Sequence, residues 1–447
     1  MAAPERQGKI MHFCVVKKMC ALACALLVCL CAAACPALAQ YESRNPLLAP
    51  QSVRYAGTED TFFNLLLMGI DLGQDGYWGS FGKDRLEECH ADAMLVVSVN
   101  LSDSSVDLVS LPRDTVTYVP GVCGIYKLNG AVHCGDTLEQ GLERACDAAS
   151  WLLGGVKVDR YCAVDMNTMI RMGDAIGGVD FDMDMSYTGH SGRVYRKGMQ
   201  HLDGVGIMDY LRARKNATVN GNDIGRTGRH RELMLAVFSK LRSQPELLAE
   251  LAGMIGADGV NILTNIGLAD IIRLAQAAAA VDVGGIGSHV ITGPYRTALD
   301  GWNFTFTDQQ ARLDVLREVY GIEAEPLKYV SRKYCEWLME KGFLSVRYID
   351  SAQRIAQYAD GITLTGAQQD ALSRLRAQID VAAQAFDDAA DAMNAGADNA
   401  MIAARKELRA QGEALAEAIG YPERINWAAG AVWYKDQRIN DYQYMWQ

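Results

Sequence analysis

The sequence has little positive charge for its size. Its 43 lysines and arginines are outnumbered by 54 aspartates and glutamates, which gives a formal net charge of −11. This deficit argues against nucleic acid as a partner, because phosphate backbones are bound through clustered Lys and Arg side chains. Any group of arginines in this chain is therefore a local site set in an acidic field.

The chain also lacks features that mark several other classes of protein. It has no CxxC pair and no Cys/His spacing of the kind that holds zinc. It contains only 10 prolines, and neither a Pro-rich or Ser-rich linker nor a long internal repeat is present. Beyond residue 39 no stretch is apolar enough to span a membrane. At 447 residues, the chain is long enough for one large domain with an appendage.

The N-terminus predicts export. Lys17 and Lys18 precede an apolar run over residues 19–39, which ends in small residues that suit signal peptidase, with cleavage before Gln40. The run is also about long enough to span a bilayer as an uncleaved anchor. The lysines place the N-terminus inside and the rest of the chain outside. We therefore interpret residues 1–39 as a signal peptide or a signal anchor, with both alternatives open.

The cysteines beyond this segment fit an oxidising compartment. They are even in number, which favours disulfides outside the cytoplasm, although many pairings are possible: Cys89, Cys123, Cys134, Cys146, Cys162 and Cys335. Cys123 and Cys134 flank a short segment that contains Lys127, and we predict that they form a bridge that pins this loop. The alternative is a set of free, buried thiols.

Hydrophobic segments early in the exported chain predict neighbouring strands. They cover residues 64–70, 93–100 and 105–111. Only residues 101–104 separate the second from the third, which favours a tight antiparallel connection. If the chain runs up, down and up through these strands, then polar residues at their ends gather at one end of the sheet.

Those polar residues are Asp71, Asp92 and Arg113. Two carboxylates and a guanidinium at one sheet end suit a divalent metal beside a phosphate. The alternative is that all three side chains are simply solvated at strand ends.

A second basic group lies further along the chain. Arg212 and Arg214 are two residues apart, so they face the same way if that segment is extended. Asp223 is a candidate cap for the helix that follows. Basic residues occupy positions i, i+3 and i+4 of that helix: Arg226, Arg229 and His230. Apolar residues continue the same stripe: Leu233, Val237 and Leu241. A helix of this kind fits either a ligand with an anionic head and a greasy tail or an ordinary amphipathic packing role.

Together these residues resemble the LytR-CpsA-Psr family of bacterial cell-wall enzymes, from about residue 62 to about residue 323. An ordered series of motifs carries the resemblance: NLLLMGID (64–71), ADAMLVVSVN (91–100), SLPRDT (110–115), KLN (127–129), GGVD (177–180), KGMQHLDG (197–204), RAR (212–214) and GRTGRHRELM (225–234).

The resemblance implies an extracytoplasmic α/β domain with three α-β-α layers and a central mixed sheet. It also implies a hydrophobic tunnel for a polyprenyl-pyrophosphate-linked glycan, such as teichoic acid or capsular polysaccharide. The implied reaction transfers the glycan phosphate to peptidoglycan with the help of Mg²⁺, at the outer face of a bacterial cytoplasmic membrane. A phosphodiester link and a polyprenyl phosphate are the products.

The resemblance also assigns residues. Asp71 and Asp92 would organise the Mg²⁺ and, with Arg113, form the catalytic group, whereas the identity of the general base stays open between the two aspartates. The remaining positions would hold the pyrophosphate: Arg113, Lys127, Arg212, Arg214, Arg226, Arg229 and His230. Arginine forks suit such an oxygen cluster better than lysine does.

The chain departs from the family pattern near these residues. Gly73 and His90 stand where arginines are common, and Ala93 stands where a hydroxyl residue is common. His230 replaces a glutamine, and a protonated histidine there would add pH sensitivity. These departures keep two other functions open, namely a non-catalytic polyprenyl-phosphate scaffold or regulator, and a hydrolase acting on the same lipid.

The remaining segments complete the predicted organisation. Helices are expected over residues 136–153 and 166–176, with apolar faces that line a tunnel or build core. Further strands are expected at 160–164, 179–183 and 287–292, and further helices at 245–254 and 268–280. Residues 365–419 have the composition and spacing of a helical hairpin or short coiled coil. We expect a linker at 40–61, the main domain at 62–324 and a helical region at 325–447.

Overall fold

The computed structural model describes the chain from residue 41 onward, with gaps. The described residues are 41–48, 52–70, 89–122, 125–183, 185–213, 223–254, 260–278, 285–291, 293, 295–299, 302–427, 431–434 and 437–438. In some elements only the backbone is described, including the first turns of the helix that begins at Asp223. The predicted signal segment lies outside these residues. Among the helices that are described, none combines the length and the hydropathy needed to cross a membrane.

A six-stranded mixed sheet forms the centre of the main domain, in the order β11-β6-β1-β2-β3-β12. Its strands are β1 (Phe62–Ile70), β2 (Ala91–Asn100), β3 (Val106–Ser110), β6 (Arg160–Asp165), β11 (Ile262–Thr264) and β12 (Gly287–Val290). β2 is antiparallel to both β1 and β3, whereas β6 and β12 run parallel to their neighbours β1 and β3. The predicted up-down-up path is therefore confirmed. The tight turn closes where the Ser104 N–H donates to the Asn100 carbonyl at 2.8 Å.

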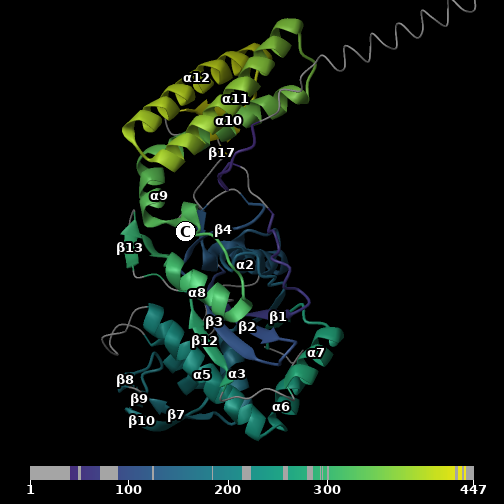
Figure 1. Ribbon diagram of the computed structural model, residues 1–447, viewed down its shortest axis with the longest axis vertical. Coiled ribbons are helices and arrows are strands. Elements are labelled where there is room, and N and C mark those ends of the chain that lie inside the picture. Colours follow the sequence, from purple (N-terminus) through teal and green to yellow (C-terminus); the bar gives the residue numbers. More distant parts are fainter. Residues whose placement is uncertain are drawn as a thin grey trace, which may run out of the picture.

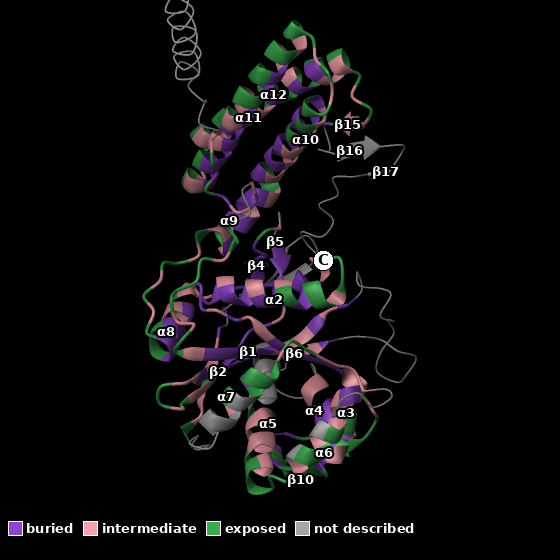
Figure 2. Ribbon diagram, turned by 90° about the vertical axis from the view of Figure 1, so that its right-hand side faces the viewer, coloured by how far each residue is buried: buried purple, intermediate pink, exposed green. Residues whose placement is uncertain are grey.

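Helices cover both faces of the sheet, which confirms the three-layer prediction (Figure 1 and Figure 2). α2 (Leu138–Leu152) and α8 (Gln309–Tyr320) pack on one face. The other side holds α3 (Met166–Ala175), α4 (Gly204–Arg212), α5 (Asp223–Ser243), α6 (Leu247–Gly253) and α7 (Leu268–Ala278). Along β1, Leu66 belongs to the α2 core, whereas Phe63 and Leu67 belong to the cluster that meets α5 and α7. This strand is thus apolar on both faces because both are covered.

Short two-stranded sheets surround this framework. They pair β4 (Val116–Tyr118) with β5 (Ile125–Lys127), β7 (Val179–Met183) with β10 (Gly198–Leu202), β8 (Tyr187–Thr188) with β9 (Val194–Tyr195), and β13 (Tyr295–Leu299) with β14 (Trp302–Phe306). The 3₁₀-helix η2 (Leu128–His133) follows β5 directly. The hairpin β4–β5 matters for the site, because its last residue is Lys127.

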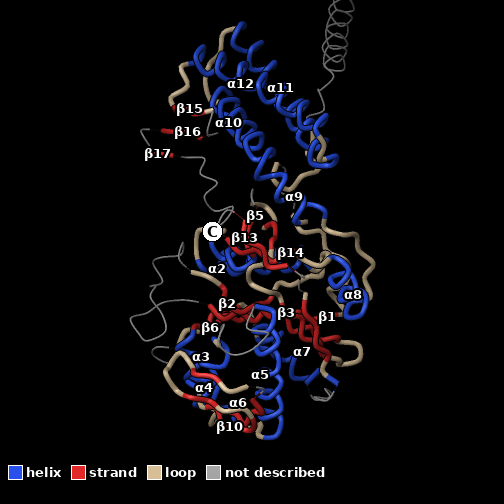
Figure 3. The backbone as a smooth tube through the Cα atoms, turned by 90° about the vertical axis from the view of Figure 1, so that its left-hand side faces the viewer, coloured by secondary structure: helices blue, strands red, loops and turns tan. Residues whose placement is uncertain are grey.

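Beyond the main domain the chain is mainly helical. Its elements are η4 (Lys328–Val330), α9 (Arg332–Trp337), the short π-helix η5 (Leu338–Gly342), α10 (Phe343–Asp360), α11 (Gly366–Ala392), α12 (Ala395–Ile419), β15 (Arg424–Asn426), β16 (Ala431–Tyr434) and β17 (Gln437–Arg438). Figure 1 and Figure 3 show α10, α11 and α12 packed together at one end of the molecule.

The predicted helical hairpin over residues 365–419 is confirmed as α11 and α12. Thr365 and Gln368 form a capping box at the start of α11, and the Asn394 side chain caps α12. The sequence did not predict α10, which packs along both helices and makes the unit a three-helix arrangement. The predicted domain boundaries stay predictions.

Candidate active site

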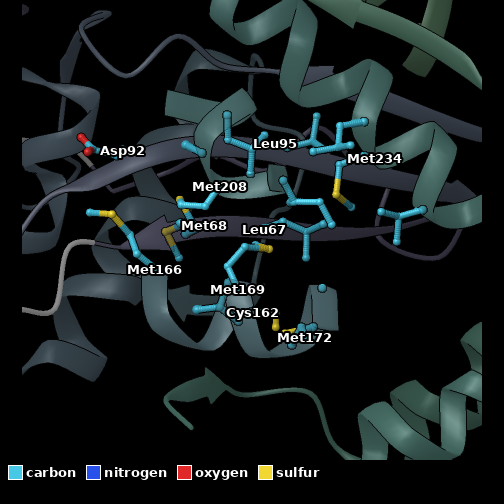
Figure 4. Close-up of a pocket in the computed structure, with 18 of the residues that line it drawn as sticks. Leu67, Met68, Asp92, Leu95, Cys162, Met166, Met169, Met172, Met208 and Met234 are labelled. Carbon is cyan, nitrogen blue, oxygen red and sulfur yellow. The ribbon is translucent and has the colours of Figure 1, made fainter. Parts of the chain in front are cut away.

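A cavity of about 330 Å³ lies between the central sheet and the helices α3, α4 and α5 (Figure 4). Its wall is mostly apolar, and residues of both sheet strands and helices contribute: Leu67, Leu95, Met169, Met172, Ile207, Leu233, Val237, Phe238 and Leu241. The predicted stripe of Leu233, Val237 and Leu241 on α5 therefore lines the cavity. Of the two early helices, α3 faces the cavity, whereas α2 packs on the opposite side of the sheet.

Methionines form much of this wall. Met166, Met169 and Met172 lie three residues apart on α3 and so share one face of the helix. Figure 4 shows them in a row with Met68 and Met208, while Asp92 lies at one end of the row. Methionine side chains are flexible and polarizable, and they adapt to ligands of irregular shape. The sequence left open whether the apolar face of residues 166–176 lines a tunnel or builds core, and the structure places that face at the cavity.

Asp92 and Arg113 form the polar end of the cavity. Asp92 is the second residue of β2, and Arg113 follows the end of β3. The antiparallel pairing of these strands therefore places both residues at the same end of the sheet. The Arg113 guanidinium contacts the Asp92 carboxylate through Nη1 and Oδ1. The Asp92 side chain is 35% exposed and that of Arg113 is 17% exposed, so solvent and ligand can reach this pair. The predicted convergence of these two residues is confirmed.

Asp114 links Arg113 to Lys127. Its buried carboxylate lies 3.9 Å from Arg113 Nε through Oδ2 and 3.4 Å from Lys127 Nζ through Oδ1. The Lys127 ammonium also lies 5.3 Å from the centre of the Phe304 ring. Sequence reasoning named Arg113 and Lys127 but missed Asp114, which follows Arg113 directly in the SLPRDT motif. A single carboxylate thus lies within ion-pair distance of two cations.

Arg212 reaches the site from helix α4. It is the last residue of α4, lines the cavity, and its Nη1 lies 3.3 Å from the sulfur of Met166. Since Arg212 is helical, the idea that an extended segment aligns it with Arg214 is wrong at this position. Arg214 itself lies outside the described residues. The arrangement still supplies a cation at the end of an apolar wall.

Asp165 is a further polar residue of the cavity that sequence reasoning missed. It ends β6 opposite Ile70 of β1, and it caps α3 by accepting from the Thr168 N–H at 2.7 Å. Asn261 Nδ2 donates to its other oxygen at 2.5 Å. These contacts make Asp165 a structural cap at the wall of the site.

Several predicted residues cannot be placed. Asp71, Gly73 and Cys123 lie outside the described residues, and the side chains of the basic stripe on α5 are not described: Arg226, Arg229 and His230. Cys134 is a free thiol in this structure, and burial raises its pKa to about 12. The predicted Cys123–Cys134 bridge is therefore not formed in this structure, and three more described cysteines are free thiols as well: Cys146, Cys162 and Cys335. The roles of the other residues named here stay predictions.

The predicted Mg²⁺ can be tested against the residues present. Within the described part of the chain, no group of three or more His, Cys, Asp or Glu side chains is arranged to hold a metal ion. Mg²⁺ in phosphate sites commonly takes only one or two carboxylates, with phosphate oxygens and water completing its shell. Asp92, a partly exposed carboxylate beside Arg113, fits one such ligand position.

Curated relatives match part of the chain. The transferase TagU of Enterococcus faecalis, named a polyisoprenyl-teichoic acid–peptidoglycan teichoic acid transferase, is 31% identical over 181 residues, which are 40% of this chain and 54% of TagU. TagU of Bacillus mycoides is 31% identical over 204 residues, 45% of this chain and 60% of that relative. The chain thus spans a little over half the length of these relatives.

Solved structures also match the chain. A protein of Enterococcus faecalis titled a transcriptional regulator has a TM-score of 0.46 and 24% identity, over 61% of this chain and 92% of its own. TagV of B. subtilis has a TM-score of 0.45 and 22% identity, over 58% and 96%. The sequence profile of the LytR_cpsA_psr family matches residues 39–319. The chain belongs to the LytR_cpsA_psr family.

Proposed function

We propose that this protein transfers a polyprenyl-pyrophosphate-linked glycopolymer to peptidoglycan and forms a phosphodiester bond. One observation carries the proposal: an apolar cavity of about 330 Å³ ends at a cluster of Asp92, Arg113 and Arg212. Such a site matches a ligand with a long hydrocarbon tail and an anionic head. The names of the TagU relatives support this substrate class, and membership of the family supports the reaction class.

In this proposal the hydrocarbon tail lies along the methionine wall of the cavity. Burial of apolar surface contributes about 25 cal/mol per Å², so a tail of several isoprene units supplies much of the affinity. The tail then fixes the position of the pyrophosphate at the polar end. Positioning of this kind is the main requirement of phosphoryl transfer, which needs little covalent help from the protein.

Arg113, Lys127 and Arg212 would bind the pyrophosphate oxygens. A guanidinium offers parallel donors that match phosphate geometry. The Asp114 carboxylate lies between the Arg113 and Lys127 side chains and fixes their positions relative to each other. Pyrophosphate competes with Asp92 for Arg113, so ligand binding would free the Asp92 carboxylate for another role.

The reaction itself is a substitution at phosphorus. A sugar hydroxyl of peptidoglycan forms a bond to the phosphorus that carries the glycan, and the bond from that phosphorus to the bridging oxygen breaks. The polyprenyl phosphate leaves, and the hydroxyl proton passes to a base, for which Asp92 and Asp71 are the candidates. Mg²⁺, held by the same aspartates, would neutralise charge on the phosphoryl oxygens.

Location follows from the substrate. A polyprenyl-linked donor is a membrane lipid and peptidoglycan lies outside the cytoplasmic membrane, so we place the protein on the outer face of that membrane. The apolar run at residues 19–39 supports export by this route. The donor polymer would be teichoic acid, capsular polysaccharide or a similar glycan.

Product analysis tests the proposal. The protein, starting near residue 40, is incubated with a short synthetic polyprenyl-pyrophosphate glycan and a peptidoglycan oligosaccharide, with Mg²⁺ or with chelator. We expect a phosphodiester-linked conjugate, detected by mass spectrometry, that forms only with Mg²⁺. Released glycan phosphate without conjugate would show a hydrolase, and bound but unreacted lipid in both conditions would show a scaffold.

A further inference from the structure

The C-terminal helices share one hydrophobic core with the strands that carry part of the anion site. Tyr118 of β4 and Phe304 of β14 are buried in the same cluster as Val330 and Tyr334 of the C-terminal region and Phe386 of α11. A separate cluster fills the space between the sheet and α2, and another packs the sheet against α5 and α7. The C-terminal helices α9 to α12, here called the helical unit, are therefore packed mainly against the β4–β5 and β14 side of the domain.

This shared core reaches the anion site directly. Val116 of β4 pairs with Lys127 of β5, and the Phe304 ring lies 5.3 Å from the Lys127 ammonium. Next to Phe304, the Thr305 N–H donates to the Asp114 carbonyl at 2.8 Å. Asp114 and Lys127 are thus held from behind by the residues that face the helices. A shift of this core would move the side chains that orient the pyrophosphate-binding cations.

The segment of residues 41–48 packs on the helical unit and forms hydrogen bonds with α11 and α9. The carboxylate of Asp387 on α11 is buried and accepts hydrogen bonds from the Tyr41 hydroxyl at 2.5 Å, the Ser43 hydroxyl at 3.0 Å and the Arg44 N–H at 2.9 Å. Asn45 donates from Nδ2 to the Tyr334 hydroxyl at 2.8 Å. These pairs join residues more than 280 positions apart in sequence.

Asp387 makes this segment a required part of the unit. A buried carboxylate is stable only when hydrogen bonds replace its lost hydration, and the segment supplies those bonds. Leu47, which is 2% exposed, adds its side chain to the shared core. Release of residues 41–48 would therefore leave the Asp387 carboxylate without these hydrogen bonds. It would also expose the core beside Tyr334.

We propose that residues 41–48 and the C-terminal helices act as one positioning unit for the anion site, holding the β4–β5 hairpin so that Lys127 faces the pyrophosphate while the Asp114 carboxylate holds Lys127 from behind. The choice of pyrophosphate as ligand rests on the proposed function. Asp387 and Tyr334 are positioning residues, because they act only through β4, β5 and β14. The apolar cavity depends on other packing, so this unit affects the head of the ligand and not its tail.

Inorganic pyrophosphate with Mg²⁺ is the probe for the head, and a short uncharged polyprenol is the probe for the tail, both measured by calorimetry. We expect Asp387→Ala to weaken pyrophosphate binding about tenfold, equivalent to about 1.4 kcal/mol, and to leave polyprenol binding within about twofold. Asp387→Asn, which keeps one acceptor oxygen, should restore most of the loss. Arg409→Ala is the matched control, because it removes an exposed 2.9 Å ion pair with Glu413 on α12.

A milder double variant, Tyr41→Phe with Ser43→Ala, removes donors without leaving a cavity and serves if Asp387→Ala does not fold. Hydrogen exchange of residues 41–48 reports whether the segment is released. Release without any loss of pyrophosphate affinity would overturn the inference, and so would equal losses for pyrophosphate and polyprenol. If the wild-type protein binds no pyrophosphate and Arg113→Ala changes nothing, the proposed function fails instead.

Discussion

Arg113 contacts two carboxylates of different exposure, and this asymmetry sets its role. Asp114 is buried and holds the guanidinium from behind, whereas Asp92 is partly exposed and meets it at the cavity. A ligand anion can replace Asp92 at the exposed side, while Asp114 keeps the side chain in place. For the proposed ligand, Arg113 would thus be oriented before binding, which would reduce the cost of binding.

Replacement of Arg113 tests whether its guanidinium binds pyrophosphate through two parallel N–H donors. Arg113→Ala is expected to weaken pyrophosphate binding by about 10- to 100-fold, since a charge-assisted pair contributes about 1.5–3 kcal/mol. Arg113→Lys should recover only part of the loss, because an ammonium cannot form two parallel bonds. Calorimetry with Mg-pyrophosphate measures both. Arg193→Ala, which removes an exposed pair with Asp203, is the control, and equal losses in all variants would refute this role for Arg113.

Asp92 should separate turnover from binding. Asp92→Asn keeps the shape of the side chain but removes its charge, and we expect conjugate formation to fall at least about 100-fold, the usual scale for a lost catalytic base or ligand. Binding of a polyprenyl pyrophosphate should persist, since the apolar wall and the cations are unchanged. Single-turnover assays beside a lipid-binding assay test this. Normal turnover in Asp92→Asn would remove Asp92 from the mechanism.

Among the helices, α3 and α5 form most of the apolar wall of the cavity, which would hold the hydrocarbon tail in the proposed function. Helix α3 approaches α4 closely through Gly173, where an added Cβ would lie 2.7 Å from the Gly204 Cα. This contact aligns the α3 methionines with Met208 and Ile207 along the cavity. Flexible sulfur-containing side chains suit a hydrocarbon chain with several double bonds.

A charge in this wall should abolish tail binding. Met169→Glu places a carboxylate in the apolar cavity, and we expect the affinity for a short polyprenol to fall by about 100-fold, because an unpaired polar group in such a site costs several kcal/mol. Met199→Glu is the matched control, since Met199 is 64% exposed on β10. Fluorescent polyprenol binding measures both variants. Retained binding in Met169→Glu would place the lipid elsewhere.

The helical unit has its own pH dependence, centred on Asp398. Burial alone would raise the pKa of Asp398, but hydrogen bonds from Lys341 Nζ and Trp337 Nε1, each at 2.8 Å, hold that pKa below its ordinary value. A lowered pKa in the folded state gives stability that is present above the unfolded pKa, about 3.9, and is lost as the pH falls through the folded pKa. We expect Asp398→Asn to reduce stability near neutral pH and to flatten the acid limb below about pH 4. Thermal unfolding followed from pH 3 to 7 tests this, and an unchanged acid limb would contradict it.

How far the sequence could predict these elements depends on the range of the contacts. The strands β1, β2 and β3 and their shared end follow from local hydrophobic runs and a short turn, so Asp92 and Arg113 were found together. Asp114 was missed because its contact with Lys127 joins two separate elements. The cap that Asp165 makes at the start of α3 is a local contact, which the sequence could have shown. The docking of residues 41–48 onto Asp387 joins positions 343 to 346 residues apart, and no local pattern encodes such a contact.

At the scale of the whole molecule, the C-terminal helices cover part of the main domain. Figure 1 shows them beyond α9, above the β4 side of the sheet, while the cavity helices lie on the opposite side. Because the core is shared, removal of the C-terminal helices would expose apolar side chains of the main domain. These side chains are Val116, Tyr118, Phe304 and Phe306. The two parts are therefore one folding unit on this side.

Truncation tests this dependence. A chain that ends after residue 326 would expose the apolar surface of β4 and β14, and we expect it to aggregate or to unfold at a temperature at least about 10 °C lower, since several buried side chains contribute about 1.5–3 kcal/mol each. Soluble yield and calorimetric Tm measure this. A soluble truncated protein with an unchanged Tm would show that the helices are an independent module.

A crystal structure of the protein with a short polyprenyl pyrophosphate and Mg²⁺ would test the proposed binding mode. We expect the hydrocarbon tail to lie along Met169 and Met172, and the pyrophosphate to contact Arg113 and Lys127 with the metal at Asp92. A tail bound outside the cavity, or a pyrophosphate away from Arg113, would contradict this binding mode.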